Sequence, residues 1–343
     1  MNNISTRANT IISLLNSDTT LSSTEISQKL NFDVRTIQRE LLTLEKLNYV
    51  NRVGKGKATS WQLNLAGKLN YIPSTKDFKD TRLSQLQPIS YNFKLLSALK
   101  TIQIFDTQET QNLQKLATTF NSKINLASQT LKKREFERLI IEFSWKSSQI
   151  EGNTYSLLET EELLKQTTVN FKHSRLETQM ILNHKLAFDY ILSNKKNFLK
   201  LSSKTILNVH SILTEKLEID PGYRKSGVGI TGSLYRPLDN QFQIQEAVTE
   251  MCEVLNQLEP FSKALLTGLL LSYIQPFNDG NKRTARMITN SVLYSCNLPM
   301  LSFRSISVEQ YRDAIIGFYE LNSLYLYKKL FVSQLEYFTE NYF

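Results

Sequence analysis

Glycine and proline are scarce in this chain of 343 residues, and their scarcity constrains its fold more than any other feature. The chain holds 11 glycines and 7 prolines, a composition that favours helices over turn-rich sheets. From about Tyr91 onward two prominent interruptions stand out: a glycine-rich segment at 219–241 and a short loop from Pro276 to Gly280. We therefore expect a mainly α-helical protein over residues 91–343.

Residue counts exclude several protein classes. A mass of 39.6 kDa is too large for one compact core, so we expect about two or three domains. Cys252 and Cys296 cannot build a disulfide framework, which indicates a reduced, cytoplasmic protein. The three histidines lack metal-ligand spacing, so a zinc site is not expected. No stretch approaches the about 18 apolar residues that span a bilayer, and no secretion signal is recognised.

Positive charge is densest near the N-terminus. The formal net charge of the chain is +9, and its first 70 residues carry nine Lys and Arg against five Asp and Glu. An excess of this kind suits a polyanionic partner without identifying it.

Residues 4–65 predict three helices followed by a hairpin. We expect helices at 6–16, from a capping box at Ser22 to about residue 30, and after an N-cap at Asp33. Strands at 49–53 and 58–65 flank a basic tip. This order resembles a winged helix-turn-helix domain, which we assign to residues 1–70, with a linker at 71–90.

The resemblance implies double-stranded DNA as a partner of residues 1–65. A recognition helix offers polar side chains to base edges, and basic residues of a wing contact phosphates. The residues expected to bind DNA are Arg35, Thr36, Gln38, Arg39, Lys55 and Lys57. The alternative is a solvated surface on a module that contacts only proteins.

The loop at 276–280 lies within the most informative stretch of the sequence, QPFNDGNKRTAR at 275–286. An apolar helix is expected to end at Ile274, and a new helix to begin near Gly280. Amides at the amino end of a helix are unpaired and bind anions, and nearby cations add the charge that phosphates require. A capped surface helix would explain the glycine. It would not explain three cations at the positive end of the helix dipole, namely Lys282, Arg283 and Arg286.

This stretch resembles the motif of the Fic family, His-x-Phe-x-(Asp/Glu)-Gly-Asn-(Gly/Lys)-Arg-x-x-Arg. The resemblance extends over roughly residues 90–300. Family members transfer AMP from ATP to a hydroxyl of a target protein on an all-helical fold, so ATP and Mg²⁺ are the implied cofactors. The matching positions are Phe277, Asp279, Gly280, Asn281, Lys282, Arg283 and Arg286.

The resemblance also implies a role for each matching residue. Asp279 would hold Mg²⁺, and Phe277 would anchor the loop in the core. The ATP phosphates would be cradled by Asn281 with the turn at Gly280 and bound by Lys282, and the outer phosphates would be reached by Arg283 and Arg286.

Two further segments are similar to parts of this family. Residues 147–152, within an expected helix at about 140–152, are similar to the inhibitory motif (Ser/Thr)-x-x-x-Glu-(Gly/Asn), here Ser147, Glu151 and Gly152. The glutamate would pair with Arg286 and obstruct the γ-phosphate. Residues 222–237 look like the family's flap, a small β-hairpin that aligns a target segment by adding a strand. The alternative is a glycine-rich connection. The aligning residues would be Val228, Ile230, Gly232 and Tyr235.

One departure from the family concerns catalysis. The first motif residue is histidine in the family, where it takes the proton of the attacking hydroxyl, and this chain has Gln275. A glutamine amide can form hydrogen bonds but cannot carry a proton away. Loss of a general base lowers a rate by about 10²–10⁴-fold. Gln275 is either natural or an introduced substitution.

Three hypotheses follow. In the first, the protein binds ATP and Mg²⁺, is gated by Glu151, has impaired or lost adenylyl transfer because of Gln275, and acts as a regulator through DNA. In the second, it is a working adenylyltransferase that modifies a Ser, Thr or Tyr hydroxyl. In the third, it is a transcription factor whose helical domain serves only assembly. The retained cations and Asp279 argue against the third hypothesis, and Gln275 argues against the second. An oligomer is compatible with each.

Overall fold

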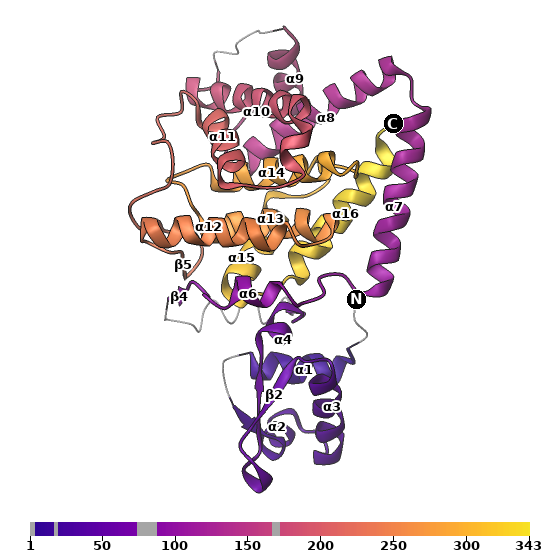
Figure 1. Cartoon of the computed structure of the whole chain (residues 1–343), viewed down its shortest axis with the longest axis vertical. Helices are drawn as coiled ribbons and strands as arrows, with labels where there is room; N and C mark the ends of the chain where they lie inside the picture. The colour runs from indigo at the N-terminus through magenta and orange to yellow at the C-terminus, as the bar shows by residue number, and fades with distance from the viewer. Residues whose placement is uncertain (1–3, 17–19, 74–87, 167–171) are drawn as a thin grey trace.

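A computed structural model describes residues 4–16, 20–73, 88–166 and 172–343. Figure 1 shows a small N-terminal unit below a large helical body, with the chain running from indigo to yellow. Most of the described residues are helical. The prediction of a mainly α-helical protein is therefore confirmed.

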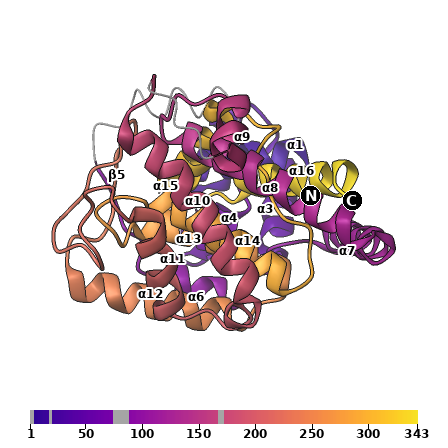
Figure 2. The same ribbon diagram turned by 90° about the horizontal axis from the view of Figure 1, so that it is seen from above.

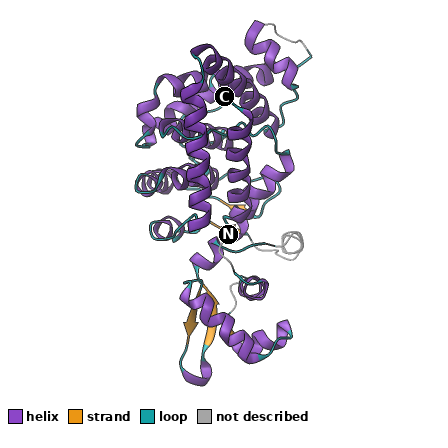
Figure 3. Cartoon of the chain, turned by 90° about the vertical axis from the view of Figure 1, so that its right-hand side faces the viewer, coloured by secondary structure: helices purple, strands orange, loops and turns teal. Residues whose placement is uncertain are grey.

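The N-terminal unit contains the predicted three helices and hairpin, together with a short additional strand. Its three strands form one antiparallel sheet in the order β1-β3-β2, with Val50 opposite Leu63 and Val53 opposite Ser60. The tip of the wing points away from the helical body (Figure 3). The elements of the unit are α1 (Thr6–Leu15), β1 (Leu21–Ser22), α2 (Ser23–Leu30), α3 (Val34–Lys46), β2 (Val50–Val53), η1 (Gly56–Ala58), β3 (Ser60–Leu63) and α4 (Leu65–Leu69).

Local sequence signals fix the ends of the first helices. The Ser22 hydroxyl accepts from the Glu25 amide, and the Glu25 carboxylate accepts from the Ser22 amide, so the predicted capping box is present. Asp33 caps α3 by accepting from the amides of Arg35 and Thr36. The inward side chains of the three helices bury a common core that includes Ile11, Leu15, Ile26, Ile37, Leu41 and Leu44.

The helical body is organised around α13, which is buried along nearly its whole length. A helix that is apolar on every side belongs inside a core, and α14, α12, α15 and α16 pack against it. Figure 2 shows α13 and α14 near the middle of the body. The helices are α6 (Leu95–Leu99), α7 (Thr107–Leu126), α8 (Gln129–Ile150), α9 (Leu157–Gln166), α10 (Arg175–Ser193), η2 (Lys195–Phe198), α11 (Ser203–Thr214), α12 (Gln241–Leu255), α13 (Pro260–Ile274), α14 (Asn281–Ser295), α15 (Val308–Leu321) and α16 (Tyr325–Asn341).

The β-hairpin expected at 222–237 is not formed. The strand in this segment, β5 (Tyr235–Arg236), pairs in parallel with β4 (Ile89–Ser90). The Tyr235 ring stacks on Tyr273 with centroids 4.5 Å apart, which holds β5 against α13. Four glycines weaken strand formation in the rest of the segment, so it follows an irregular path.

The junction between the unit and the body involves part of the predicted linker. Residues 74–87 of that linker lie outside the described residues, whereas Tyr71 is buried in the core of the N-terminal unit. The Ser323 hydroxyl donates to the Tyr71 carbonyl at 2.6 Å, and the Leu324 amide donates to the Leu69 carbonyl at 2.9 Å. The end of α4 therefore rests on the turn between α15 and α16. Among the described helices, none combines the length and the hydrophobicity of a membrane-spanning segment.

Candidate functional site

The loop between α13 and α14 leaves the amino end of α14 open. Gly280 forms the N-cap with φ 80°, and no side chain caps the first turn. A glycine is required there because φ is positive and because a Cβ would lie 3.1 Å from the Thr214 methyl group. The first amides of α14 therefore retain the donor capacity of an uncapped helix, which suits an anion.

Asn281 shapes this loop rather than pointing its side chain out of it. Its amide oxygen accepts from the Phe277 amide at 2.8 Å, and its amide nitrogen donates to the Phe277 carbonyl at 2.8 Å. Phe277 is fully buried, as expected for an anchor, and stacks on His210 with ring centroids 3.6 Å apart. The side chain of Asn281 is thus committed to the loop, and a contribution of this residue to phosphate binding would come from its backbone.

The three cations of the motif differ in burial. The side chains of Arg283 and Arg286 are 2% and 0% exposed, whereas that of Lys282 is 36% exposed. One guanidinium nitrogen of Arg283 pairs with the Asp279 carboxylate at 3.0 Å. Its other terminal nitrogen, Nη1, is buried without a hydrogen-bond partner among the described residues. An unsatisfied buried donor is costly, so this nitrogen suits an incoming phosphate oxygen.

The sequence-predicted contact between Glu151 and Arg286 is present. Glu151 Oε1 lies 2.8 Å from Arg286 Nη2, and Glu151 Oε2 lies 3.3 Å from Lys282 Nζ. Burial by itself would raise the pKa of Glu151, but the charges of Arg286 and Lys282 hold that pKa at about 2. A carboxylate that stays ionised therefore occupies two of the cations assigned to phosphates.

A second set of contacts holds Arg286 from α8. Arg286 Nε donates to the Ser147 hydroxyl at 2.9 Å, and Nη2 donates to the Ser147 carbonyl at 2.9 Å. The guanidinium also lies 5.0 Å from the centre of the Tyr311 ring. Ser147 is bonded in turn to His184 at 2.9 Å. The sequence indicates a role for Ser147 but not for His184 or Tyr311, because neither of these two residues belongs to a local motif.

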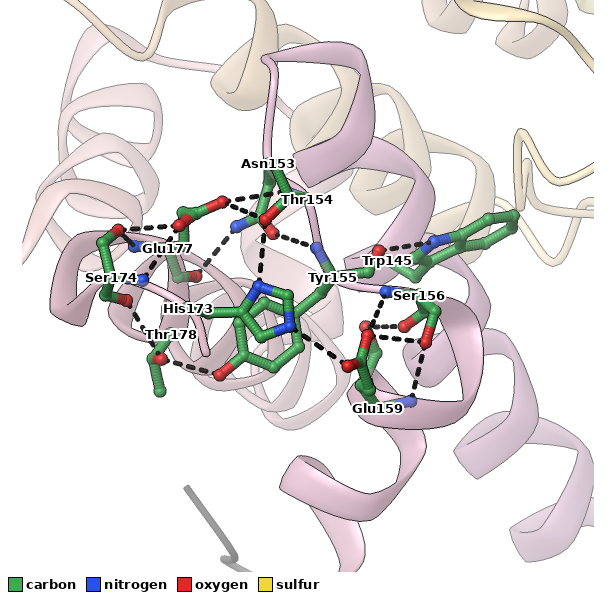
Figure 4. Close-up of polar contacts among 11 residues, drawn as sticks. Trp145, Asn153, Thr154, Tyr155, Ser156, Glu159, His173, Ser174, Glu177 and Thr178 are labelled. Carbon is green, nitrogen blue, oxygen red and sulfur yellow. Dashed lines mark hydrogen bonds and ion pairs between the residues drawn. The ribbon is translucent and has the colours of Figure 1, made fainter. Parts of the chain in front are cut away.

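The turn after Glu151 is anchored by the polar network drawn in Figure 4. Gly152 begins the turn with φ 93°. Thr154 donates to the Glu177 carboxylate at 2.7 Å, and His173 lies between Thr154 and Glu159 with its ring stacked on Tyr155. This network ties the end of α8 to α9 and α10, so the position of Glu151 depends on all three helices.

Gln275 ends α13 in the left-handed conformation, with φ 51°, and is 7% exposed. Its side-chain nitrogen donates to the Ser272 carbonyl at 2.6 Å and to the Tyr319 hydroxyl at 3.1 Å. The carbonyl partner requires the nitrogen on that side of the amide. The side chain at the family's histidine position is therefore turned toward the end of its own helix.

The chain's three histidines each have partners of their own among the described residues. His210 is 1% exposed and contacts the Asp279 carbonyl from beneath the loop, at 2.9 Å. His184 is fully buried behind Ser147, and His173 belongs to the network after Glu151. The rings of His184 and His210 are therefore closed to solvent, and His173 is bonded to Thr154 and Glu159.

Arg224 connects the loop to the base of the flap segment. Its amide donates to the Pro276 carbonyl at 3.0 Å and its Nε donates to the Gln275 carbonyl at 2.6 Å. Its remaining nitrogens donate to the carbonyls of Ser226 and Leu238. From the sequence this arginine belongs only to a flap-like pattern, whereas in the structure its buried side chain holds the loop between α13 and α14.

The residues expected to align a target lie in different surroundings. Gly232 is exposed, and Val228 and Ile230 are half-buried. Tyr235 is 1% exposed and its hydroxyl donates to the Tyr273 carbonyl. The prediction that Tyr235 contacts a target was therefore wrong. Its side chain lies inside the core, where it packs against neighbouring residues.

The residues expected to bind DNA gather on α3 and the wing. Arg35, Gln38 and Arg39 are exposed on α3, and Thr36 beside them is half-buried. Lys55 is exposed at the tip of the wing. Lys57 follows in η1, and its side chain lies outside the described part of the structure. The described cations thus lie on the surface, where a phosphate backbone can reach them.

Asp279 is the residue that the sequence leads us to expect as a ligand of Mg²⁺. Its side chain is 68% exposed at the end of the loop, directly before the N-cap of α14. No group of three or more His, Cys, Asp or Glu among the described residues could hold a metal ion. Mg²⁺ is commonly bound by one or two carboxylates together with substrate phosphates, so a single exposed carboxylate beside a phosphate site fits this ion.

Comparison with protein families identifies two domains. The profile of the Fic/DOC family matches residues 200–293, and that of an HTH domain matches residues 7–53. A Fic/DOC domain and an N-terminal HTH domain are therefore present.

Curated relatives carry the name protein adenylyltransferase Fic. That of Drosophila grimshawi is 32% identical over 154 residues, which are 44% of this chain and 32% of the relative. That of Aedes aegypti is 26% identical over 243 residues, or 65% of this chain and 46% of the relative. The chain spans about a third to a half of the length of these relatives.

Solved structures share the fold. Fic-1 from C. elegans has a TM-score of 0.61 at 18% identity, covering 90% of this chain and 84% of that chain. A signalling protein with a Fic domain from Bacteroides thetaiotaomicron has a TM-score of 0.56 at 21% identity, covering 67% and 94%. The Fic fold expected from the motif is confirmed.

Proposed function

We propose that this protein binds ATP with Mg²⁺ at the amino end of α14, that Glu151 restrains the site, and that Gln275 impairs or abolishes adenylyl transfer. We further propose that the N-terminal domain binds double-stranded DNA, which makes the chain a regulator. The observation that carries the proposal is the pair of contacts from the Glu151 carboxylate to Arg286 and Lys282.

The charges at the amino end of α14 favour a phosphate ligand. Two guanidinium groups are buried beside a helix amino end, and desolvated cations of this kind require an anionic partner. Glu151 supplies one negative charge to Arg286, and Asp279 supplies one to Arg283. A triphosphate carries more charge and more acceptor oxygens than either carboxylate, so it would compete with Glu151 for these groups.

Glu151 would lower ATP affinity in two ways. Its carboxylate fills the contact that Arg286 would otherwise make with an outer phosphate, and its charge repels the phosphate. Removal of Glu151 would therefore free Arg286 without removing any donor from the site.

Gln275 would slow adenylyl transfer because it cannot act as the general base. The reaction joins the hydroxyl oxygen of the target to the α-phosphorus, releases pyrophosphate and requires a group that accepts the hydroxyl proton. Gln275 cannot accept it, and its amide is already bonded to Ser272 and Tyr319. Asp279 would hold Mg²⁺, which would neutralise phosphate charge when bound.

The DNA proposal rests on the HTH domain and on the exposed cations of α3 and the wing. Exposed Arg35 and Arg39 can reach the major groove while Lys55 reaches the backbone. Binding of duplex DNA that weakens when Arg35 and Arg39 are replaced would distinguish this proposal from a module that contacts only proteins.

The test compares ATP binding and label transfer from α-labelled ATP. We expect Glu151→Gln and Glu151→Gly to bind ATP at least about tenfold more tightly than the unaltered chain, because one charge-assisted contact is removed. Glu162→Gln, an equal change of charge at an exposed site on α9, is the control and should leave affinity unchanged.

Transfer is measured in the Glu151→Gly background with and without Gln275→His. We expect the added histidine to raise transfer by about 10²–10⁴-fold. Failure of every Glu151 variant to bind ATP would refute the nucleotide site. Strong self-labelling by the unaltered chain would support a working adenylyltransferase instead of an impaired one.

A further inference from the structure

We infer that His184 is a positioning residue that holds Arg286 in place for the outer phosphates of ATP, acting through the hydroxyl of Ser147. This inference rests on the proposed ATP site and adds to it a residue from α10, outside both sequence motifs.

The hydrogen bonds among these groups allow only one arrangement of protons for a neutral ring. Arg286 Nε can only donate, so the Ser147 oxygen accepts from it at 2.9 Å. The Met180 carbonyl can only accept, so His184 Nδ1 carries a proton and donates to it at 2.8 Å. His184 Nε2 is then an acceptor, and it takes the remaining proton of Ser147 at 2.9 Å. Each group is thereby oriented by the next, from the Met180 backbone to the guanidinium.

The surroundings keep His184 neutral and fix its plane. The ring is fully buried, and burial lowers the pKa of His184 to about 3 although its bond to the Met180 carbonyl opposes this. The charges that act on it are those of Arg283, Arg286 and Glu151. The Phe143 ring meets the imidazole edge to face, with centroids 6.0 Å apart. A neutral, immobile acceptor therefore stands behind Ser147.

Arg286 is consequently held by two independent sets of contacts. Glu151 approaches Nη2 and would have to leave for a phosphate to bind. The Ser147 hydroxyl and carbonyl approach Nε and Nη2 from α8, and both contacts can persist after Glu151 has left. The link from His184 would thus keep the guanidinium ordered in the state that binds ATP, where Glu151 no longer orders it.

The test is made in the Glu151→Gly background by measuring the dissociation constants of ATP and AMP. AMP lacks the outer phosphates, so it reports on the fold of the site without involving Arg286. We expect His184→Leu, which removes the acceptor, to weaken ATP binding about tenfold and to leave AMP binding unchanged. His184→Gln, whose amide oxygen can accept from Ser147, should restore most of the ATP affinity.

Ser147→Ala provides a second, milder break of the same link. It should also weaken ATP selectively, and adding His184→Leu to it should cause little further loss, because the two residues act through one contact. If thermal melting shows that His184→Leu fails to fold, His184→Phe, which keeps a planar ring and removes the acceptor, takes its place in both comparisons.

Three outcomes are distinguishable. An equal loss of ATP and AMP affinity in both variants would assign His184 a purely structural role and overturn the inference. Unchanged ATP affinity in folded variants would overturn it as well. Absence of ATP binding in the Glu151→Gly parent itself would instead refute the proposed nucleotide site on which the inference depends.

Discussion

Two helices of this protein carry a pair of arginines in their first two turns, and the two pairs have opposite surroundings. On α3, Arg35 and Arg39 are exposed. On α14, Arg283 and Arg286 are 2% and 0% exposed. An exposed guanidinium keeps its water and can meet any phosphate that approaches, whereas a buried one must be satisfied by groups at fixed positions.

The difference separates two ways of binding an anion. The α3 pair would contribute a salt-dependent attraction that tolerates variation in the position of the partner. The α14 pair is held by Asp279, Glu151 and Ser147, so its geometry is set before a ligand arrives. Burial therefore fixes the positions of Arg283 and Arg286 before a ligand binds. It also means that removing either arginine should destabilise the protein.

The largest effect is expected from Arg286→Ala. It leaves the largely buried Glu151 with only Lys282, and loss of one partner of a buried ion pair destabilises a protein by about 3–5 kcal/mol. Denaturant unfolding measures the change. Arg312→Ala, at an arginine whose side chain is 59% exposed, is the control and should cost less than about 0.5 kcal/mol. An equal loss of stability in the two variants would show that burial does not make Arg286 more important for the fold than an exposed arginine.

The exposed pair should affect DNA binding and leave stability nearly unchanged. We expect Arg35→Ala with Arg39→Ala to weaken duplex binding about 10–100-fold at low salt and to reduce the slope of log affinity against log salt by about 2. Titration at several salt concentrations measures both. The control is Lys133→Ala with Arg134→Ala, the same change of charge on exposed α8 positions, and it should keep the slope. Equal retention of DNA by all variants would favour a protein-contact module.

Acid should lower the free energy of unfolding because His184, which lies behind Arg286, is neutral in the folded protein. The pKa of His184 is lowered to about 3 by burial, below its usual value of about 6.5 in an unfolded chain. The unfolded state therefore binds this proton first. The stabilising effect is complete above about pH 6.5 and is lost as pH falls toward 3, by up to about 1.4 kcal/mol for each pH unit.

Glu151 stays ionised in the folded protein between pH 7 and 4, because its pKa is about 2. Unfolding curves collected from pH 7 to 4 for the unaltered chain and His184→Gln report the contribution of the histidine. Parallel pH dependence in the two proteins would show that His184 does not take up a proton on unfolding.

The smallest effect concerns the cap of α3. Asp33 accepts from the amides of Arg35 and Thr36, and Asp33→Ala should cost about 1 kcal/mol of stability. Asp33→Asn retains the acceptor and should cost less. Unlike α3, α14 has no side-chain cap, because its first turn is left open at Gly280. Equal melting temperatures of the two Asp33 variants would show that the side-chain cap does not stabilise α3.

The sequence was sufficient for features encoded by neighbours. The capping box at Ser22, the N-cap at Asp33 and the turn at Gly280 depend on residues a few positions apart, so each could be read directly. The pairing of Glu151 with Arg286 was also anticipated, because two motifs of one family occur in the same chain.

Other features depended on contacts that no local pattern encodes. The prediction of a flap hairpin was wrong. Tyr235 packs in the core against Tyr273, and its strand pairs with residues 89–90. Gln275 could be recognised as a departure, but its bonds to Ser272 and Tyr319 could not be foreseen.

The sequence by itself determined the helices, their ends and the set of cations proposed to bind phosphate, since helix periodicity, caps and charge are properties of short segments. Only the tertiary structure decided which of those groups are buried, and that His184 on α10 supports Ser147 on α8 behind Arg286 on α14. The physical reason is that burial and hydrogen-bond partnership arise when helices distant in the chain pack together, and the free energy of each charge depends on that packing.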